Sequence, residues 1–305
     1  MLVGPGAYSD ISLKHFEIVL LPSLQTPKCN LPELPVDKIH AYMINSDDDG
    51  ISICGGVIGY VFGVNWTSEC FRLSFNTNKW IPFPETPSLS TKRRDAGSVR
   101  LGQAWWIAGG ESVSYLATTE VRAQNGTWIP GPLLPNAVGQ HCMVNIDNKR
   151  VFLAGGRNGS HKSMASTYIY NMDNNTWKRM PDMTFARALH SCTLVDEDII
   201  LISGGRHDGG YGFISSSEFF SVSEQTWSKG PELPVATYSA QMVTVGGITY
   251  HVGGNPTRTD IYQLEKNGSS YSDWTWTKVK SLEEDKAYFG AVPFRFYSEN
   301  CNGWQ

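Results

Sequence analysis

Basic and aromatic residues recur at two kinds of position along the chain. Arg157, next to Asn158, and Arg206 each directly follow a pair of adjacent glycines. Arg93 and Arg187 stand at matching distances before short apolar segments. At or beside the starts of such segments the chain also has Lys286, His141, His190, Tyr238 and Tyr288. Guanidinium groups bind carboxylates through two parallel hydrogen bonds, so this set favours recognition of an acidic ligand. For each arginine taken singly, a solvated side chain on a polar turn is the alternative.

The chain lacks the motifs of common catalytic and metal sites. It has no phosphate loop of the form Gly-x-x-x-x-Gly-Lys-Ser/Thr, no HExxH zinc helix and no GxSxG nucleophile elbow. Cysteines occur at positions 29, 54, 70, 142, 192 and 301, without a CxxC pair or a histidine at metal-ligand spacing. The segment Arg206-His207-Asp208 is more typical of a solvated turn than of a metal site. We therefore expect no metal, no cofactor and no catalysis.

A repeat of about fifty residues positions these side chains. Adjacent glycines occur at 55–56, 109–110, 155–156, 204–205 and 253–254, and a tryptophan follows each pair at 80, 128, 177, 227 and 276. Successive tryptophans are 48, 49, 50 and 49 residues apart. Each unit contains a polar-to-apolar segment, a hydrophobic segment ending in Gly-Gly, a third apolar segment and then the tryptophan with a proline-rich link. This order predicts four short strands per unit.

Sheets of this kind favour a radial arrangement. One four-stranded sheet cannot bury both faces alone, whereas sheets stacked around an axis bury one another. The glycines would allow close approach of neighbouring backbones, and the tryptophans would supply apolar area between sheets. The repeat resembles the Kelch repeat over nearly the whole chain. That resemblance implies an all-β propeller forming a single domain over residues 1–305.

The ends of the chain indicate six blades. Five complete units span 36–91, 92–135, 136–184, 185–234 and 235–282. A sixth begins at 283, because KAYFGAVPF (286–294) aligns with RALHSCTLV (187–195). Its missing part is expected from residues 1–31, because QTPKCNLPELP (25–35) resembles EQTWSKGPELP (224–234) and HFEIVLL (15–21) falls where a third strand belongs. We therefore expect C-terminal inner strands paired with N-terminal outer strands. This composite blade lacks the Gly-Gly pair and the tryptophan of the other units, and only Cys301-Asn302-Gly303-Trp304 lies near the expected place of the glycines. A five-bladed ring therefore remains the alternative.

The segment AGGRNGS (154–160) resembles the loop after Gly-Gly in the Kelch domains of substrate adaptors for cullin-type ubiquitin ligases. The resemblance implies binding of an acidic peptide or loop at the mouth of the central channel, and it assigns that role to Arg157, Asn158, Arg187, Arg206 and Arg93. The N-terminal domains of those adaptors are absent from these residues, so ligase-adaptor activity is not expected. A carbohydrate-processing propeller like the Kelch-type sialic-acid epimerases and an actin-binding Kelch protein are the alternatives. Convergent carboxylates and a deep pocket would favour the enzyme.

Charge and hydropathy limit which classes of partner, and which cellular compartment, we expect for this chain. The net charge is −4, with no long basic run and no apolar stretch long enough to span a membrane, so we expect neither nucleic acid nor membrane as a partner. The N-terminus lacks a secretory signal pattern, and the scattered cysteines are expected mainly as small buried hydrophobes in a cytoplasmic protein. Five Asn-x-Ser/Thr sequons argue for secretion instead, at Asn65, Asn125, Asn158, Asn174 and Asn267. The sequence does not name the partner or the oligomeric state.

Overall fold

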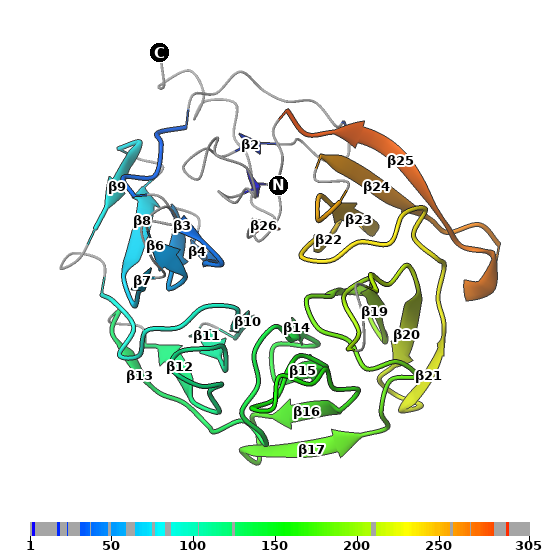
Figure 1. The fold of residues 1–305 in the computed structure, drawn as a ribbon, viewed down its shortest axis with the longest axis horizontal. Coiled ribbons are helices and arrows are strands. Elements are labelled where there is room, and N and C mark those ends of the chain that lie inside the picture. The colour runs from blue at the N-terminus through cyan, green and yellow to red at the C-terminus, as the bar shows by residue number, and fades with distance from the viewer. Residues whose placement is uncertain are drawn as a thin grey trace.

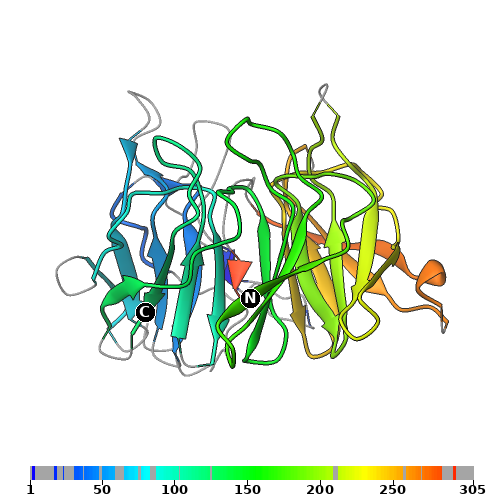
Figure 2. The ribbon, with the colours of Figure 1, turned by 90° about the horizontal axis from the view of Figure 1, so that it is seen from below.

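The computed structural model is an all-β propeller in which sheets surround one axis (Figures 1 and 2). The structure describes residues 2–3, 17–18, 23, 31–36, 38–47, 50–58, 65–74, 77–82, 87–102, 104–123, 126–208, 212–256, 259–268, 270–283 and 291–292. Five sheets have four antiparallel strands each, and the chain visits them in order around the axis. The five repeats thus correspond to five complete blades.

The strand bounds follow the repeat. Blade 1 contains β4 (Tyr42–Asp47), β5 (Gly50–Cys54), β8 (Cys70–Ser74) and β9 (Lys79–Ile81). Blade 2 contains β10 (Gly97–Leu101), β11 (Ala104–Ala108), β12 (Thr119–Arg122) and β13 (Trp128–Pro130). Blade 3 contains β14 (Cys142–Asn145), β15 (Arg150–Ala154), β16 (Thr167–Asn171) and β17 (Thr176–Met180). Blade 4 contains β18 (Ser191–Asp196), β19 (Ile199–Ser203), β20 (Ser217–Ser221) and β21 (Thr226–Lys229). Blade 5 contains β22 (Gln241–Val245), β23 (Ile248–Val252), β24 (Asp260–Glu265) and β25 (Thr275–Ser281), with the 3-10 helix η1 (Tyr271–Asp273) before β25.

A three-stranded sheet joins the two ends of the chain. Its order is β2 (Glu17–Ile18), β1 (Leu2–Val3) and β26 (Ala291–Val292), and β26 contacts the first strands of blades 5 and 1. Strands from the two ends of the chain therefore pair in one sheet, in which β2 is the third strand counted from β26. The second strand is a correction, because residues 2–3 supply it from the N-terminus. The aligned segments 25–30 and 301–304 lie outside the described residues.

The core lies between blades. The second strands β5 and β19 are buried along their whole lengths, because each is covered by sheets on both sides. Phe152 of blade 3 packs against Phe220 and Trp227 of blade 4, with ring centroids 5.3 and 6.2 Å apart. Hydrophobic second segments ending in Gly-Gly recur in every unit of the repeat, and this packing explains them.

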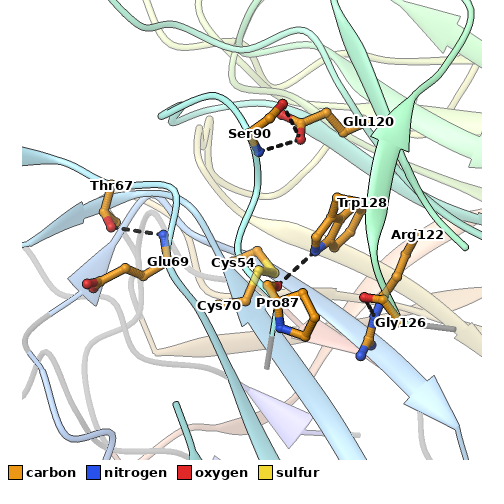
Figure 3. The surroundings of a disulfide bond; sticks show 10 residues. All are labelled: Cys54, Thr67, Glu69, Cys70, Pro87, Ser90, Glu120, Arg122, Gly126 and Trp128. Carbon is orange, nitrogen blue, oxygen red and sulfur yellow. Dashed lines mark hydrogen bonds between the residues drawn. A yellow bond between two sulfur atoms is a disulfide. The ribbon is translucent and has the colours of Figure 1, made fainter. Parts of the chain in front are cut away.

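The tryptophans also fasten one blade to the link of the preceding one. The indole N–H of Trp80, Trp128 and Trp227 donates to the carbonyl oxygen of Pro32, Pro87 and Pro181, respectively, at 2.9, 3.1 and 2.8 Å. Figure 3 shows the Trp128 bond. The tryptophans are scaffold residues, as expected, and in Trp80, Trp128 and Trp227 this hydrogen bond adds a directional contact to the buried area.

The paired glycines permit close contact between blades. Gly155 and Gly156 have φ of 63° and 91°, and the N–H of Gly156 donates to the carbonyl oxygen of Arg187 at 2.9 Å. A Cβ on Gly155 would lie 2.6 Å from that oxygen and 2.6 Å from the ring of His190. Both the left-handed backbone and the contact therefore require glycine here.

Four cysteines form disulfides, which corrects the expectation that the cysteines serve mainly as small buried hydrophobes. Cys54 pairs with Cys70 between β5 and β8 (Figure 3), and Cys142 pairs with Cys192 between blades 3 and 4. No cysteine among the described residues is free, and Cys29 and Cys301 lie outside them. In the described part of the chain, no helix is long and apolar enough to cross a membrane.

Candidate functional site

The residue after each Gly-Gly pair meets the segment that leads into the first strand of the same blade. Glu111 pairs with Arg94, Arg157 with Gly139, Arg206 with Ala188 and Asn255 with Tyr238, each as an isolated antiparallel bridge. In blade 1 the same place is taken by a small sheet of β3 (Lys38–Ile39), β6 (Val57–Ile58) and β7 (Asn65–Trp66). We call this end of the propeller the entry face. The residues after the Gly-Gly pairs and the segments before the first strands therefore meet at this end.

Arg93 and Arg187 do not line the entry face, which corrects their assignment to partner binding. Both side chains are fully buried. Nη1 of Arg187 donates to the carbonyl oxygens of Gly204 and Ser216, both at 2.9 Å, and Nη2 lies 2.8 Å from Oε1 of Glu218. Arg93 repeats this pattern with Gly109, Thr118 and Glu120. These arginines satisfy carbonyl groups at strand ends, so they are part of the scaffold.

His141 and His190 are also buried, and neither is placed to contact a partner. Their rings pack against the backbone of the preceding blade, where a Cβ on Gly109 would lie 2.9 Å from His141 and one on Gly155 would lie 2.6 Å from His190. Burial lowers the pKa of His141 to about 4. Burial, reinforced by the charge of Arg187, lowers the pKa of His190 to about 3. Both rings are therefore neutral spacers at pH 7.

Arg157 remains on the entry face and is partly exposed. Its Nη2 lies 3.7 Å from Oδ1 of Asp208, and its Nε is buried without a hydrogen-bond acceptor. Asp208 also accepts from the backbone N–H and the hydroxyl of Ser163. A carboxylate of blade 4 thereby holds the loop of blade 3 that begins at Arg157.

Arg206 stands beside Arg157 in the neighbouring loop and is also partly exposed. Its guanidinium carbon lies 5.4 Å from the ring centroid of Tyr238, and its Nε is buried without an acceptor. None of the described carboxylates forms an ion pair with Arg206. Tyr238 is itself buried, and its ring centroid lies 4.7 Å from that of Phe213. Its role is therefore to hold the Arg206 guanidinium in place, and little of its ring is open to a partner.

Asn158 organises its own loop. Its Oδ1 accepts from the backbone N–H groups of Ser160 and Lys162 at 3.0 and 3.1 Å, which closes the turn after Arg157. The remaining predicted site residues, Lys286 and Tyr288, lie outside the described residues.

A polar cluster that was not predicted from the sequence lies at the entry to blades 1 and 2. Nδ1 of His40 lies 2.6 Å from Oδ1 of Asp95, and Arg94 pairs with Glu111 at 2.7 Å. Burial would raise the pKa of Asp95, but the charge and hydrogen bond of His40, aided by Arg94, leave it below its usual value. Only Glu111 carried a signal, since it directly follows Gly109-Gly110.

An aromatic contact ties two loops of the entry face together. The Tyr115 hydroxyl lies 3.3 Å from Nδ1 of His161, and the two rings meet edge to face. Burial, followed by the charge of Glu111, raises the pKa of Tyr115, so its hydroxyl is protonated at neutral pH. The loops of blades 2, 3 and 4 are thus held in place by contacts with one another.

An apolar groove adjoins Arg206 on the outside of blade 4. It has a volume of about 610 Å³, and its lining includes Phe185, His207, Phe213 and Trp227. Phe185 and Phe213 are 52% and 38% exposed, which is high for phenylalanine and favours contact with another molecule. Among the described residues no group of three or more His, Cys, Asp or Glu side chains is arranged to hold a metal ion.

Known proteins share both the repeat and the fold. The Kelch motif is matched by residues 140–184. The chain is 28% identical over 243 residues to mouse Kelch-like protein 40, covering 76% of this chain and 37% of that protein. It is 25% identical over 157 residues to Kelch-like protein 41b of Danio rerio, covering 48% of this chain and 25% of that protein. Beta-scruin of Limulus polyphemus is 28% identical over 120 residues, covering 37% of this chain and 13% of that protein.

Among solved structures, YjhT superposes with a TM-score of 0.74 at 10% identity, covering 87% of this chain and 91% of YjhT. That likeness concerns the fold alone. The chain spans only about a quarter to two fifths of the two Kelch-like relatives' own lengths. Five Gly-Gly and tryptophan units on five blades, together with these matches, show that the chain is built of Kelch repeats.

Proposed function

We propose that the chain is a non-catalytic interaction module that binds an acidic peptide or protein loop at its entry face. The observation that carries this proposal is the pair Arg157 and Arg206. They stand on adjacent loops and both are partly exposed, and Arg206 forms no ion pair with a described carboxylate. A bound carboxylate would meet their exposed guanidinium nitrogens, and a guanidinium group can offer two parallel hydrogen bonds to it.

The geometry around the pair favours binding in two ways. Asp208, Ser163 and Tyr238 already fix the loops, so little conformational entropy would be lost when a ligand arrives. The groove beside Phe213 would accept an apolar side chain of the same ligand. The preferred ligand therefore combines an acidic residue with a neighbouring apolar one.

A carbohydrate-processing enzyme has weaker support from the same face. Its carboxylates are already engaged, Asp95 by His40 and Glu111 by Arg94. A general acid or base needs a carboxyl group that can exchange a proton near its operating pH. The depressed pKa of Asp95 works against that role.

We also propose that the sheet of β1, β2 and β26 is the inner part of a sixth blade. It occupies the gap between blades 5 and 1 (Figure 1), and β26 takes the place of a first strand. Trp80 bonds to Pro32 as later tryptophans bond to the link of the preceding blade, which supports residues 31–35 as the link out of that blade.

The binding proposal is tested with ligands selected from a peptide-display library and measured by titration calorimetry. Arg206→Ala and Arg157→Ala are each expected to weaken the selected ligand at least tenfold, which corresponds to about 1.4 kcal/mol. Arg150→Ala is the matched control, because Arg150 is a partly exposed arginine paired with Asp147 at the opposite end of blade 3. Lysine at position 206 should restore part of the affinity, and raised salt should weaken binding. The proposal would be refuted by selected ligands without acidic residues. It would also be refuted if both alanine variants bound the selected ligand as tightly as the parent protein does.

A further inference from the structure

The disulfides indicate the compartment in which the chain folds. Cys54 and Cys70 are directly opposite each other on β5 and β8, and Cys142 and Cys192 join the first strands of two blades across 50 residues of sequence. Such bonds form and persist in oxidising compartments and are rare where glutathione keeps thiols reduced. All four described cysteines are paired, so the bridges are a consistent feature of this part of the fold.

One sequon lies in a position suited to modification in such a compartment. Asn174 and Asn175 belong to the exposed turn between β16 and β17, and Thr176 is the exposed first residue of β17. The Thr176 hydroxyl donates to Oδ1 of Asn174 at 2.7 Å, and no described residue is bonded to Nδ2, the atom that would carry a sugar. Asp173 of this turn bonds to Lys149 of the hairpin after β14. Both turns therefore lie at the end of blade 3 opposite the entry face, where strands β14 and β16 finish.

We propose that the chain matures in an oxidising secretory compartment and carries an N-linked glycan on Asn174. The transfer forms a bond between Nδ2 of Asn174 and the anomeric carbon of a lipid-linked pyrophosphate oligosaccharide. The bond from that carbon to the pyrophosphate breaks, the lipid pyrophosphate leaves with the bonding electrons, and Nδ2 loses one proton. Each disulfide forms when two thiols transfer two electrons and release two protons to a disulfide oxidant by exchange.

Asn174 differs from two of the other sequons, Asn158 and Asn267, in its surroundings. Asn158 lies on the entry face with its Oδ1 held by two backbone N–H groups, and Asn267 uses its Nδ2 to bond Thr275 at 3.3 Å. A glycan on Asn174 would leave Arg157 and Arg206 uncovered. The proposal does not depend on peptide binding, and either one can fail without the other.

The test uses the protein isolated by antibody from the cells that produce it. The sample is alkylated without reduction, treated with peptide N-glycosidase F in heavy-oxygen water and mapped by mass spectrometry. The expected results are Asp in place of Asn174 with heavy oxygen incorporated, and a Cys142–Cys192 cross-linked peptide. Unmodified Asn174, or alkylated Cys142 and Cys192, would overturn the proposal.

A second experiment isolates the sequon from the folding of the chain. The full chain is passed through the secretory pathway of cultured eukaryotic cells, and its shift on glycosidase treatment is compared among variants. Thr176→Ala should lose the Asn174 glycan while Thr176→Ser keeps it, although Asn174 is unchanged in both. If Thr176→Ala retains the glycopeptide, or if the parent lacks it in folded secreted protein, Asn174 is not the site.

Discussion

Replacing Arg187 with valine should destabilise the propeller strongly while leaving its entry face in place. The side chain is fully buried and makes bonds to Gly204, to Ser216 and to Glu218. Glu218 accepts a second bond from the backbone N–H of Thr184 at 2.7 Å, so the pair connects the link before blade 4 with two strands of that blade. Valine would remove one charge and leave the other in a buried site.

The magnitude follows from that unmatched charge. Breaking a buried ion pair by removing one partner costs about 3–5 kcal/mol. The two carbonyl oxygens that lose Arg187 add to this cost unless water enters. We therefore expect Arg187→Val to lower the free energy of unfolding by about 3–5 kcal/mol, which is a large fraction of the total for a protein of ordinary stability.

Blade 3 supplies the compensating substitution. The N–H of Gly110 donates to the carbonyl of Val138, as that of Gly156 donates to Arg187, so valine occupies the equivalent place in the link before blade 3. Tyr168 stands opposite Leu153 as Glu218 stands opposite Ile202. The double variant Arg187→Val with Glu218→Tyr should recover most of the loss, because apolar replacement of a whole buried pair is often neutral.

Urea unfolding followed by tryptophan fluorescence measures both variants, with Arg206→Ala as the matched control. Arg206 is partly exposed and should change stability by less than about 0.5 kcal/mol. A loss below about 1 kcal/mol in Arg187→Val would show that the pair is not a scaffold element. A double variant as unstable as the single one would show that blade 3 is not a valid guide to blade 4.

Two further predictions concern the inter-blade contacts. Trp227→Ala should lower the free energy of unfolding by about 3–5 kcal/mol, whereas Trp227→Phe, which loses mainly the bond to Pro181, should cost clearly less; chemical denaturation distinguishes them. Because the folded protein lowers the pKa of His190 from 6.5 to about 3, the unfolded chain gains a proton first as pH falls. Stability should be independent of this group above pH 6.5 and should decline between pH 6.5 and 3 by up to about 1.4 kcal/mol per pH unit. Urea midpoints at several pH values should show a smaller decline in a folded His190→Gln variant, and an equal decline would contradict the assignment.

Much of the fold was predictable because its strongest constraints act on single residue types. Only glycine fits where Gly155 meets the carbonyl of Arg187, and a tryptophan fills the space between blades that Trp227 shares with Phe152. Such residues must recur wherever the geometry recurs, so their period revealed the blades. The end of the ring carries neither residue, and its second strand could not be assigned by alignment for that reason.

The site was less predictable because residues of the same type, at similar places in the repeat, can direct their side chains to different surroundings. Arg187 and Arg206 are both arginines beside a strand end, yet one turns between blades and the other faces outward. The buried arginine is distinguished by a partner on the third strand, Glu218, as Arg93 is by Glu120. A glutamate at that strand position, paired with an arginine in the link, is the signal that separates scaffold from surface. Disulfide partners such as Cys142 and Cys192 lacked any local spacing signal, because their proximity arises only when adjacent blades stack.

A series of backbone hydrogen bonds between blades explains why the residues of the entry face could not be predicted from residue types in the sequence. His40, Asp95, Gln140, Leu189 and Ser239 all have φ between 52° and 59°, a conformation that costs a non-glycine residue about 1–2 kcal/mol. From Gln140 onward, the N–H of each donates to the carbonyl of the preceding member at 2.7 to 2.9 Å, which links consecutive blades. Bonds between blades compensate for the strained backbone at these five positions, which share no residue type. Their side chains differ from blade to blade, and those of Asp95 and Ser239 are largely buried, so no pattern of residue types in the sequence marks this part of the entry face.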